Sequence, residues 1–204
     1  MPPTLLIASN NAHKHKELRE IFATLAPEIR LVGPAEIGLT LDPDETADTY
    51  LGNAALKAHA FARAVEGRGL WVIADDSGLE VDALGGRPGI YSARYHRTAP
   101  NQDGCQRLLD EMRGVPRERR TARFQGVIVL IRPDGVEGDF MATCEGVIGV
   151  GKRVAKGFGF DPVFQVAGGA RMMSEISEEE KNRVGHRGLA AAKAIAWMKH
   201  GGPQ

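Results

Sequence analysis

The chain has 204 residues, which is long enough to bury a hydrophobic core without disulfides or structural metals. Lys plus Arg number 26 and Asp plus Glu also number 26, so no overall basic charge indicates a nucleic-acid partner and no acidic excess indicates a solvating tail. Cys105 and Cys144 lack the spacing of a metal site or a disulfide framework, which favours two packing thiols in a reducing, cytoplasmic protein, and no segment approaches the roughly 18 apolar residues of a membrane helix.

The chain begins with a predicted strand, a loop and a helix. Segment 1–8 has no basic n-region and its apolar run is too short for a signal peptide, so we predict a first strand there. After residues 9–12, apolar side chains recur at helical spacing, which predicts a helix with one buried face. These apolar residues are Leu18, Ile21, Phe22 and Leu25. The charged residues that we expect to face solvent are Lys14, Lys16, Glu17, Arg19 and Glu20.

A second strand and a second helix follow. We predict a short strand at residues 29–32 and an acidic loop at 42–45, before a helix that begins near residues 48–49. The apolar side chains that predict the buried side of this helix are Leu51, Ala55, Ala58, Phe61, Ala62 and Val65. Asn53 and Lys57 lie one turn apart on another side of the helix.

The most informative stretch is residues 71–78, where an apolar run is followed by two acids, a hydroxyl and a glycine. We predict a buried strand at 70–74, a turn at Asp75-Asp76 and a short strand at 79–81. Adjacent carboxylates repel each other, so a divalent cation or a hydrogen-bond donor would explain them. Asp, Ser and Gly are also ordinary turn residues, and the segment alone leaves open whether it is a solvated turn or a metal site.

A hairpin is predicted in the second half of the chain. Two segments rich in Val, Ile, Phe and Thr, residues 123–131 and 136–147, are joined by the turn sequence Arg132-Pro133-Asp134-Gly135. We expect a second lobe built around this antiparallel ribbon. No internal repeat or linker separates independent domains, so residues 1–204 are expected to form a single domain.

The remaining segments predict helices and loops. Residues 85–89 form a turn cluster, and residues 90–95 have no pattern that assigns them. Helices are predicted at about 102–112 and about 188–199. The Arg- and Glu-rich connection at 113–120 is predicted to be a solvated loop.

Four segments carry the residue types of phosphate chemistry. They are the first loop with Lys14, the loop of Glu45 with Lys57 beyond it, Asp75-Asp76-Ser77, and the set Lys181, His186 and Arg187. Together they would provide carboxylates for a metal and cations for polyanionic oxygens, as a phosphate ester or anhydride requires. The first loop lacks the G-x-G-x-x-G and G-K-[ST] patterns, which argues against a dinucleotide oxidoreductase and a P-loop NTPase. In residues 157–162, rings flanked by glycines either face a flat base or belong to the core.

Five motifs occur in order along nearly the whole chain. They are Ser9-x-Asn11-x-x-Lys14, Ala74-Asp75-Asp76-Ser77-Gly78-Leu79, Gly86-x-Pro88-Gly89-x-x-Ser92-Ala93-Arg94-Tyr95, Gly157-Phe158-Gly159-Phe160-Asp161-Pro162-x-Phe164 and Glu180-Lys181-x-x-x-x-His186-Arg187. In these motifs and in their order, the chain resembles the inosine/xanthosine triphosphate pyrophosphatase family.

The resemblance implies an α/β fold in which a mixed sheet with flanking helices forms two lobes around a central cleft. It implies hydrolysis of the α-β phosphoanhydride of dITP, ITP or XTP to the nucleoside monophosphate and diphosphate, with Mg2+ as cofactor. This activity would cleanse the nucleotide pool and keep deaminated purines out of DNA and RNA. The resemblance also implies that the protein is a homodimer and that its site binds a purine nucleoside triphosphate.

The resemblance further assigns roles to residues of this chain. Asp76 matches the metal-associated acid that accepts a proton from water, and Glu45 is expected to be a second metal ligand. The expected substrate-binding residues are Ser9, Asn11 and Lys14 in the first loop, Lys57 near the phosphates, Ser77 beside Asp76, Phe158 stacked on the base with Gly159, Phe160 and Asp161 completing that wall, and Lys181, His186 and Arg187, which recognise the base and its 6-oxo edge.

The sequence departs from the family pattern at three positions. Asn10 and His13 stand where relatives often have small residues such as glycine, and we expect His13 to face solvent. Ala47 stands where glycine is usual, which keeps the Glu45 carboxylate but alters the backbone of its loop.

Two other functions fit the sequence less well. A nucleotide-binding regulator without catalysis would gain nothing from the Asp75-Asp76 acids and the lysines around them. A nucleic-acid-binding module based on the basic cluster at 113–123 is opposed by the neutral net charge.

Overall fold

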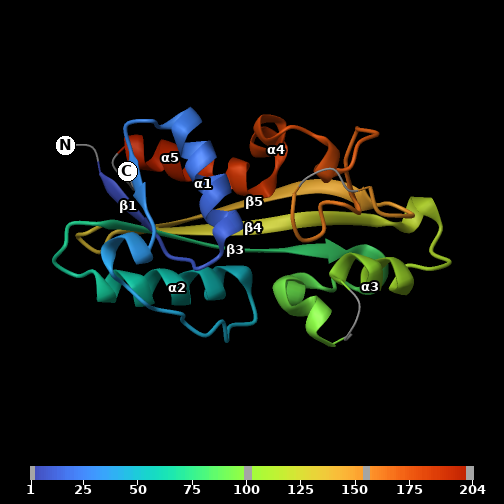
Figure 1. The fold of residues 1–204 in the computed structure, drawn as a ribbon, viewed down its shortest axis with the longest axis horizontal. Helices are drawn as coiled ribbons and strands as arrows, with labels where there is room; N and C mark the ends of the chain where they lie inside the picture. The colour runs from blue at the N-terminus through green and yellow to red at the C-terminus, as the bar shows by residue number, and fades with distance from the viewer. Residues whose placement is uncertain (1–2, 99–102, 154–156, 201–204) are drawn as a thin grey trace. The chain divides into compact units, whose positions relative to one another are not determined.

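A six-stranded mixed sheet, in the order β2-β1-β3-β4-β5-β6, organises the fold (Figure 1). Its strands are β1 (Thr4–Ile7), β2 (Arg30–Val32), β3 (Trp71–Val81), β4 (Thr121–Ile131), β5 (Glu137–Ile148) and β6 (Phe164–Val166). β1 pairs in parallel with β2 and with β3, so that Leu5 lies opposite Leu31 and Trp71. β5 and β6 pair antiparallel. The predicted mixed α/β fold with flanking helices is confirmed.

The structure is a computed structural model that describes residues 3–98, 103–153 and 157–200. Its α-helices are α1 (Ala12–Leu25), α2 (Tyr50–Ala64), α3 (Gly104–Glu111), α4 (Glu178–Val184) and α5 (His186–Lys199). The short 3-10 helices are Ala35–Ile37, Asp82–Leu84, Gly89–Thr98, Arg117–Arg119 and Met173–Glu175. The helix predicted from about residue 102 therefore begins at Gly104, and residue 102 itself lies outside the described residues. None of the helices in the described ranges is long and apolar enough to cross a membrane.

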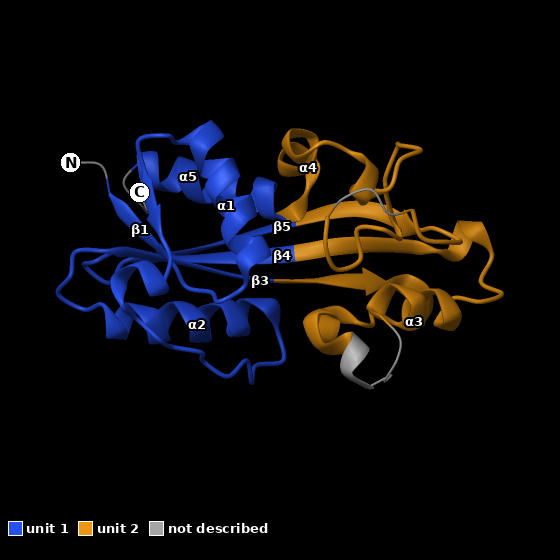
Figure 2. Ribbon diagram, viewed as in Figure 1, with its two compact units in different colours: residues 1–76, 126–142, 187–204 blue, residues 77–125, 143–186 orange. Residues whose placement is uncertain are grey.

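The chain divides into two units (Figure 2). Unit 1 comprises residues 1–76, 126–142 and 187–204, and unit 2 comprises residues 77–125 and 143–186. The second lobe was expected to be built around the predicted ribbon. The turn of the ribbon and the strand segments next to it, residues 126–142, belong instead to unit 1, so that part of the prediction is wrong. The hairpin itself is confirmed, because the Arg132 N–H donates to the Val136 carbonyl at 2.8 Å. The cleft implied by the resemblance stays a prediction.

In unit 1 the strands separate two helical layers. Helices α1 and α5 cover one face of the sheet and α2 covers the other (Figure 1). Ile7 and Ile73 belong to the core beneath α1 and α5, whereas Val72 and Ala74 belong to the core beneath α2. Odd-numbered and even-numbered residues of β3 thus point to opposite faces, as the pleat of a strand requires. This alternation decides where the next two residues, both acids, place their side chains.

The turn predicted at Asp75-Asp76 is wrong. β3 runs without interruption from Trp71 to Val81, and both acids are buried within it. Acids are uncommon in strands, but strand preference depends on the surroundings of the side chain. Here each carboxylate has a charged partner within hydrogen-bond or ion-pair distance, so the strand continues through them.

Two features of the predicted helix faces are also wrong. Lys14 and Glu17 were expected to face solvent, yet the Lys14 side chain is only 14% exposed and Glu17 is buried. They lie on the same side of α1 as Leu18, and they extend its buried stripe into a region where charges are paired. Conversely, Leu25 and Leu51 were predicted to be buried and are exposed by 43% and 41%.

The loop predicted to be solvated at 113–120 contains a buried guanidinium. Arg120 is 5% exposed, and its N–H groups donate to the carbonyl oxygens of Ile148, Met112 and Gly149 at 2.8, 2.8 and 2.7 Å. Buried backbone carbonyls need donors, and Arg120 supplies three of them at once within unit 2. The solvated-loop prediction is therefore wrong for this residue.

Candidate active site

Asp75 and Asp76 present their carboxylates to opposite faces of unit 1. Asp75 continues the odd-numbered set of β3 toward α1 and α5, and Asp76 continues the even-numbered set toward α2. The side-by-side repulsion that the sequence suggests is therefore reduced by the pleat of the strand. Each acid is the centre of a separate group of charged residues.

The Asp75 group consists of Lys14, Glu17, Asp75 and Arg187. Both Arg187 Nε and Nη2 lie 2.9 Å from Asp75 Oδ2, and Arg187 Nη1 binds the carboxylate of Glu17. Lys14 Nζ lies 3.1 Å from both Asp75 Oδ1 and the Asp75 carbonyl oxygen. Helices α1 and α5 thus deliver two cations and one further acid to a single buried carboxylate. Hydrogen bonds between charged partners such as these are stronger than those between neutral groups.

The charges around Asp75 decide its protonation. Burial alone would raise the pKa of Asp75, but Arg187 and Lys14 outweigh it and hold the pKa of this carboxyl well below its usual range. Burial would likewise lower the pKa of Arg187, and the carboxylates of Asp75 and Glu17 outweigh it and raise the pKa. Asp75 is therefore ionised near neutral pH, with its charge balanced inside the protein.

The Asp76 group consists of Glu45, Asn53, Lys57 and Asp76. Lys57 Nζ lies 2.5 Å from Glu45 Oε1 and 3.7 Å from Asp76 Oδ1, so one ammonium group serves two carboxylates. Asn53 Nδ2 donates to Asp76 Oδ2 at 3.3 Å. Asn53 and Lys57 are one turn apart on α2, and both are buried.

Asp76 has the opposite pKa shift from its neighbour. Burial raises the pKa of Asp76, and the ammonium groups of Lys57 and Lys14 do not cancel that shift. For Lys57, burial lowers the pKa, while Asp76, Asp75 and Glu45 together outweigh it and raise the pKa. Two adjacent carboxyls with pKa values pushed apart are the pattern of a structural acid beside a proton acceptor.

The predicted phosphate-binding residues lie at the N-terminus of α1. Asn11 is its N-cap, and Asn11 Oδ1 accepts hydrogen bonds from the backbone N–H groups of His13 and Lys14 at 2.9 and 3.3 Å. Ser9 Oγ accepts from the Asn11 N–H at 3.1 Å. Capping explains the presence of Asn11 by itself. A helix N-terminus beside Lys14 also favours an anion.

Asn10 and His13, the two departures in the first loop, are exposed. Asn10 Nδ2 donates to the Leu41 carbonyl at 2.9 Å and to Asp42 Oδ1 at 3.1 Å. The asparagine therefore ties the first loop to the segment that leads into the acidic loop, a contact that glycine would lack. The expectation that His13 faces solvent is confirmed.

In unit 2, Asp161 organises the Phe158 group, which consists of Phe158, Asp161 and Lys181. Asp161 Oδ2 accepts from the Phe158 N–H at 2.9 Å and from Lys181 Nζ at 2.6 Å, and that ammonium lies 4.7 Å from the centroid of the Phe158 ring. Gly157 has φ +88°, and a Cβ there would lie 2.3 Å from Asp161 Oδ2. Glycine is required at this position by both its conformation and the close carboxylate.

The other predicted residues of unit 2 lie in different settings. Phe160 is 5% exposed and belongs to the core, so only Phe158 of the two rings is partly exposed. Gly159 has φ +60°, and its carbonyl accepts from the Cys105 thiol at 3.1 Å. The imidazole of His186 stacks on the Phe124 ring with a centroid distance of 5.2 Å. Ser77 follows Asp76 on β3 and is half-buried.

Arg187 is predicted to act with Lys181 and His186, but the contacts of Arg187 described above are with the Asp75 group of unit 1. Its role in base recognition stays a prediction. Glu17 and Asn53 were not predicted to belong to the site. For Glu17, the available signal was its position one turn before the apolar Ile21 on α1. For Asn53, it was the position one turn before Lys57 on α2.

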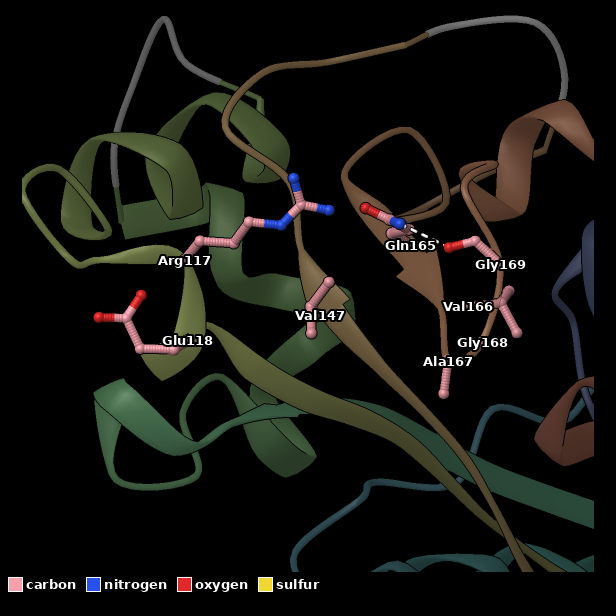
Figure 3. Close-up of a pocket in the computed structure, with 8 residues that line it drawn as sticks. All are labelled: Arg117, Glu118, Val147, Gln165, Val166, Ala167, Gly168 and Gly169. Carbon is pink, nitrogen blue, oxygen red and sulfur yellow. Dashed lines mark hydrogen bonds between the residues drawn. The ribbon is translucent and has the colours of Figure 1, made fainter.

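An open pocket of about 470 Å³ lies in unit 2 and contains none of the predicted site residues (Figure 3). It is lined by Arg117, Glu118, Val147, Gln165, Val166, Ala167, Gly168 and Gly169. Its charged side chains, Arg117 and Glu118, are both exposed, and Gln165 Nε2 donates to the Gly169 carbonyl at 2.6 Å. The pocket therefore has no buried charged group that would select a ligand.

Comparison with known proteins identifies the family. The sequence matches the Ham1 family over residues 5–197. The chain belongs to the Ham1 family. This Ham1-family chain is 46% identical over 191 residues to the dITP/XTP pyrophosphatase of Methylococcus capsulatus, a match that covers 92% of each chain. It is 42% identical over 199 residues to the dITP/XTP pyrophosphatase of Thermus thermophilus, which covers 98% of this chain and 93% of the relative.

Solved structures agree with this assignment. The Staphylococcus aureus Ham1 protein superposes with a TM-score of 0.82 at 36% identity, covering 97% of this chain and 99% of that chain. The nucleoside-triphosphatase, or dITP/XTP pyrophosphatase, of Mycobacterium abscessus superposes with a TM-score of 0.70 at 35% identity, covering 94% and 98%. These identities extend the family assignment from the sequence to the fold.

The Asp76 group of this Ham1-family chain offers the carboxylate oxygens that a divalent cation uses when a bound ligand supplies its other oxygens. Residues 3–98, 103–153 and 157–200 contain no group of three or more His, Cys, Asp or Glu side chains that could hold a metal ion by themselves. Mg2+ in proteins is commonly held by one or two carboxylates together with substrate phosphates. Glu45 and Asp76 are two such carboxylates, and Lys57 lies within ion-pair distance of both. Burial raises the pKa of Asp76 despite the ammonium groups of Lys57 and Lys14.

Proposed function

We propose that this chain is a hydrolase that cleaves the α-β phosphoanhydride of dITP, ITP and XTP, releasing the nucleoside monophosphate and diphosphate. In the cell, this reaction would remove deaminated purines from the nucleotide pool before they enter DNA or RNA. The observation that carries the proposal is the Asp76 group, in which two carboxylates share one lysine and the pKa of Asp76 is raised. The relatives named dITP/XTP pyrophosphatase supply the substrate class.

The phosphates of the substrate require cations. A nucleoside triphosphate carries about four negative charges, which must be balanced before water can approach phosphorus. Ser9, Asn11 and Lys14 at the start of α1 are proposed to bind the phosphates, together with Lys57 of α2 and Ser77 of β3. The support is a helix N-terminus with a largely buried ammonium group beside it.

Asp76 is proposed to act as the general base. It accepts a proton from the attacking water, while the oxygen of that water bonds to phosphorus and diphosphate leaves with the electron pair of the anhydride bond. Glu45 and Asp76 would hold Mg2+, which neutralises phosphate charge when bound. A raised pKa makes Asp76 a stronger base than an ordinary aspartate, and Asn53 and Lys57 keep its carboxylate in place.

The base of the substrate is proposed to be recognised by its 6-oxo group. Phe158 would stack on the ring, with Gly159, Phe160 and Asp161 beside it, and Lys181, His186 and Arg187 would donate hydrogen bonds. Adenine has a 6-amino group, which is a donor, so the donors of the protein would have no acceptor to bind. Unpaired donors of this kind discriminate strongly against adenine nucleotides. Support comes from the partly exposed Phe158 ring and the Lys181 ammonium over it.

We also propose that residues 1–204 form one functional domain, because both units contribute predicted site residues. A homodimer is proposed from the family resemblance, and a cytoplasmic location from two buried free thiols. Size-exclusion chromatography with light scattering measures the mass in solution. A mass of about twice 22.0 kDa supports the dimer, and a mass of one chain contradicts it.

The decisive assay measures diphosphate release from a parallel panel of dITP, ITP, XTP, ATP and GTP, with Mg2+ and with EDTA. We expect release from dITP, ITP and XTP, little from ATP and GTP, and none in EDTA. Binding of dITP without release would instead identify a nucleotide-binding regulator. Equal release from all five triphosphates would contradict base recognition at the 6-oxo group.

A further inference from the structure

Asn53 connects the Asp76 carboxylate to the loop that carries Glu45. It lies on α2, its exposure is 0%, and each end of its side-chain amide makes one hydrogen bond. Asn53 Nδ2 donates to Asp76 Oδ2 at 3.3 Å, and Asn53 Oδ1 accepts from the Ala47 N–H at 2.9 Å. Ala47 is two residues after Glu45, so a single buried amide contacts the proposed base and the loop of the second proposed metal ligand.

The partners of Asn53 fix its orientation. A carboxylate oxygen only accepts hydrogen bonds and a backbone N–H only donates, so the NH2 end of the amide must face Asp76 and the oxygen must face Ala47. Exchanging the two ends would place oxygen against oxygen and nitrogen against nitrogen inside the protein, where unpaired polar groups are costly. The amide therefore has one stable orientation, and that orientation links the loop to the strand.

The backbone of the Glu45 loop is held close to the first turn of α2. A Cβ at Gly52 would lie 2.6 Å from the Ala47 Cβ, so glycine at 52 leaves the space that Ala47 occupies. Thr49 Oγ1 accepts from the Gly52 N–H at 3.0 Å and caps the helix at the same place. Lys57, one turn beyond Asn53, completes the connection by contacting both Glu45 and Asp76.

We infer that Asn53 is a positioning residue that holds Asp76 and the Glu45 loop at a fixed separation, so that the two carboxylates bind a divalent cation together. The inference rests on the proposed function for its assignment of Asp76 and Glu45. In the proposed reaction Asn53 itself touches neither the attacking water nor a phosphate. Groups that orient metal ligands through hydrogen bonds commonly change affinity or rate by about 10- to 100-fold when removed.

The test compares Asn53→Ala with Thr49→Ala. Both changes remove a polar contact at the start of α2, but only Asn53 contacts Asp76. We expect Asn53→Ala to lower kcat for dITP by about tenfold or more with a much smaller change in KM, and to weaken Mn2+ binding to the substrate-free protein by about tenfold. We expect Thr49→Ala to lower the melting temperature while kcat and Mn2+ affinity stay within about twofold of the unsubstituted protein.

Electron paramagnetic resonance of free Mn2+ measures the affinity without any need for turnover. If the unsubstituted protein binds Mn2+ but releases no diphosphate, the proposed function fails while the role of Asn53 is still decided by the Mn2+ measurement. If Asn53→Ala does not fold, Asn53→Ser carries the same expectations, because its hydroxyl is too short to reach both partners. Values of kcat and Mn2+ affinity within twofold of the unsubstituted protein in a folded Asn53 variant would overturn the inference.

Discussion

Asp75 and Asp76 are neighbours in the chain, yet Arg187 holds the carboxylate of Asp75 while Lys57 and Asn53 of α2 hold that of Asp76. The pleat of β3 separates them, so the two acids have different partners and opposite pKa shifts. Their substitutions are expected to have different consequences. Changes at Asp75 act mainly on stability, and changes at Asp76 act mainly on rate.

Asp76→Asn is expected to lower kcat for dITP by orders of magnitude, because the amide cannot accept the proton of the attacking water. Substrate binding is expected to remain measurable, since the phosphate-binding cations are unchanged. Diphosphate release and calorimetric titration of dITP check the two statements. Near-normal turnover in this variant would rule out Asp76 as the general base.

Asp75→Asn is expected to lower the free energy of unfolding by about 3 kcal/mol at neutral pH, because it leaves Arg187 buried with one carboxylate fewer. Urea unfolding monitored by circular dichroism measures the loss. The matched control is Asp76→Asn on the adjacent residue of the same strand. A loss of stability that is equal in both variants would contradict the separation of the two acids.

The two acids are also expected to act on stability in opposite directions as pH changes. The pKa of Asp75 is lower in the folded protein than the unfolded value of about 3.9, so its stabilisation is present above about pH 4 and is lost as pH falls through the folded pKa. The pKa of Asp76 is raised, so its contribution is favourable below about pH 4 and is lost as pH rises through the folded pKa.

Unfolding free energies measured in EDTA from pH 3 to pH 7 test these signs. The advantage of the unsubstituted protein over Asp75→Asn is expected to shrink as pH falls. Asp76→Asn is expected to become more stable relative to the unsubstituted protein as pH rises, because the amide avoids burying a poorly balanced charge. The opposite trend in either variant would contradict the pKa direction on which it depends.

The elements of the fold follow from local patterns, and the groups of the site only partly do. The apolar spacing of α1 and the Thr49 cap of α2 are local signals, and both helices form where the sequence indicates them. Lys14 and Asp76 were recognised because they lie in motifs. Glu17 was missed because an acid on a helix is ordinarily solvated, and only the guanidinium of Arg187, 170 residues away, explains its burial.

The break predicted in β3 was wrong for the same reason. Two acids and a glycine after an apolar run indicate a turn when only neighbours in sequence are considered. The partners that keep the strand intact, Arg187 and Lys57, come from α5 and α2, and their contacts are tertiary. Arg120, predicted to be solvated, is likewise buried because carbonyls of two other segments need its donors.

Arg187→Ala tests base recognition and stability together. If Arg187 reads the 6-oxo edge, its loss is expected to raise KM for ITP far more than KM for ATP. Its loss is also expected to destabilise the protein by about 3 kcal/mol, because Asp75 and Glu17 lose a buried partner. Glu17→Gln is the matched control, since it disturbs the same ion pair and keeps the guanidinium. Equal KM changes for the two nucleotides in Arg187→Ala would contradict base recognition by this residue.

The thiols of Cys105 and Cys144 are expected to resist alkylation in the folded protein. Both side chains are buried, and burial raises the pKa of each thiol to about 11. Because the thiolate is the reactive form, only about one molecule in a thousand would carry it at pH 8 at either position. Iodoacetamide at pH 8 is therefore expected to leave the native mass unchanged over an hour and to add two labels in urea. Rapid labelling of the native protein would contradict this prediction, because it would show that one thiol is accessible and ionised.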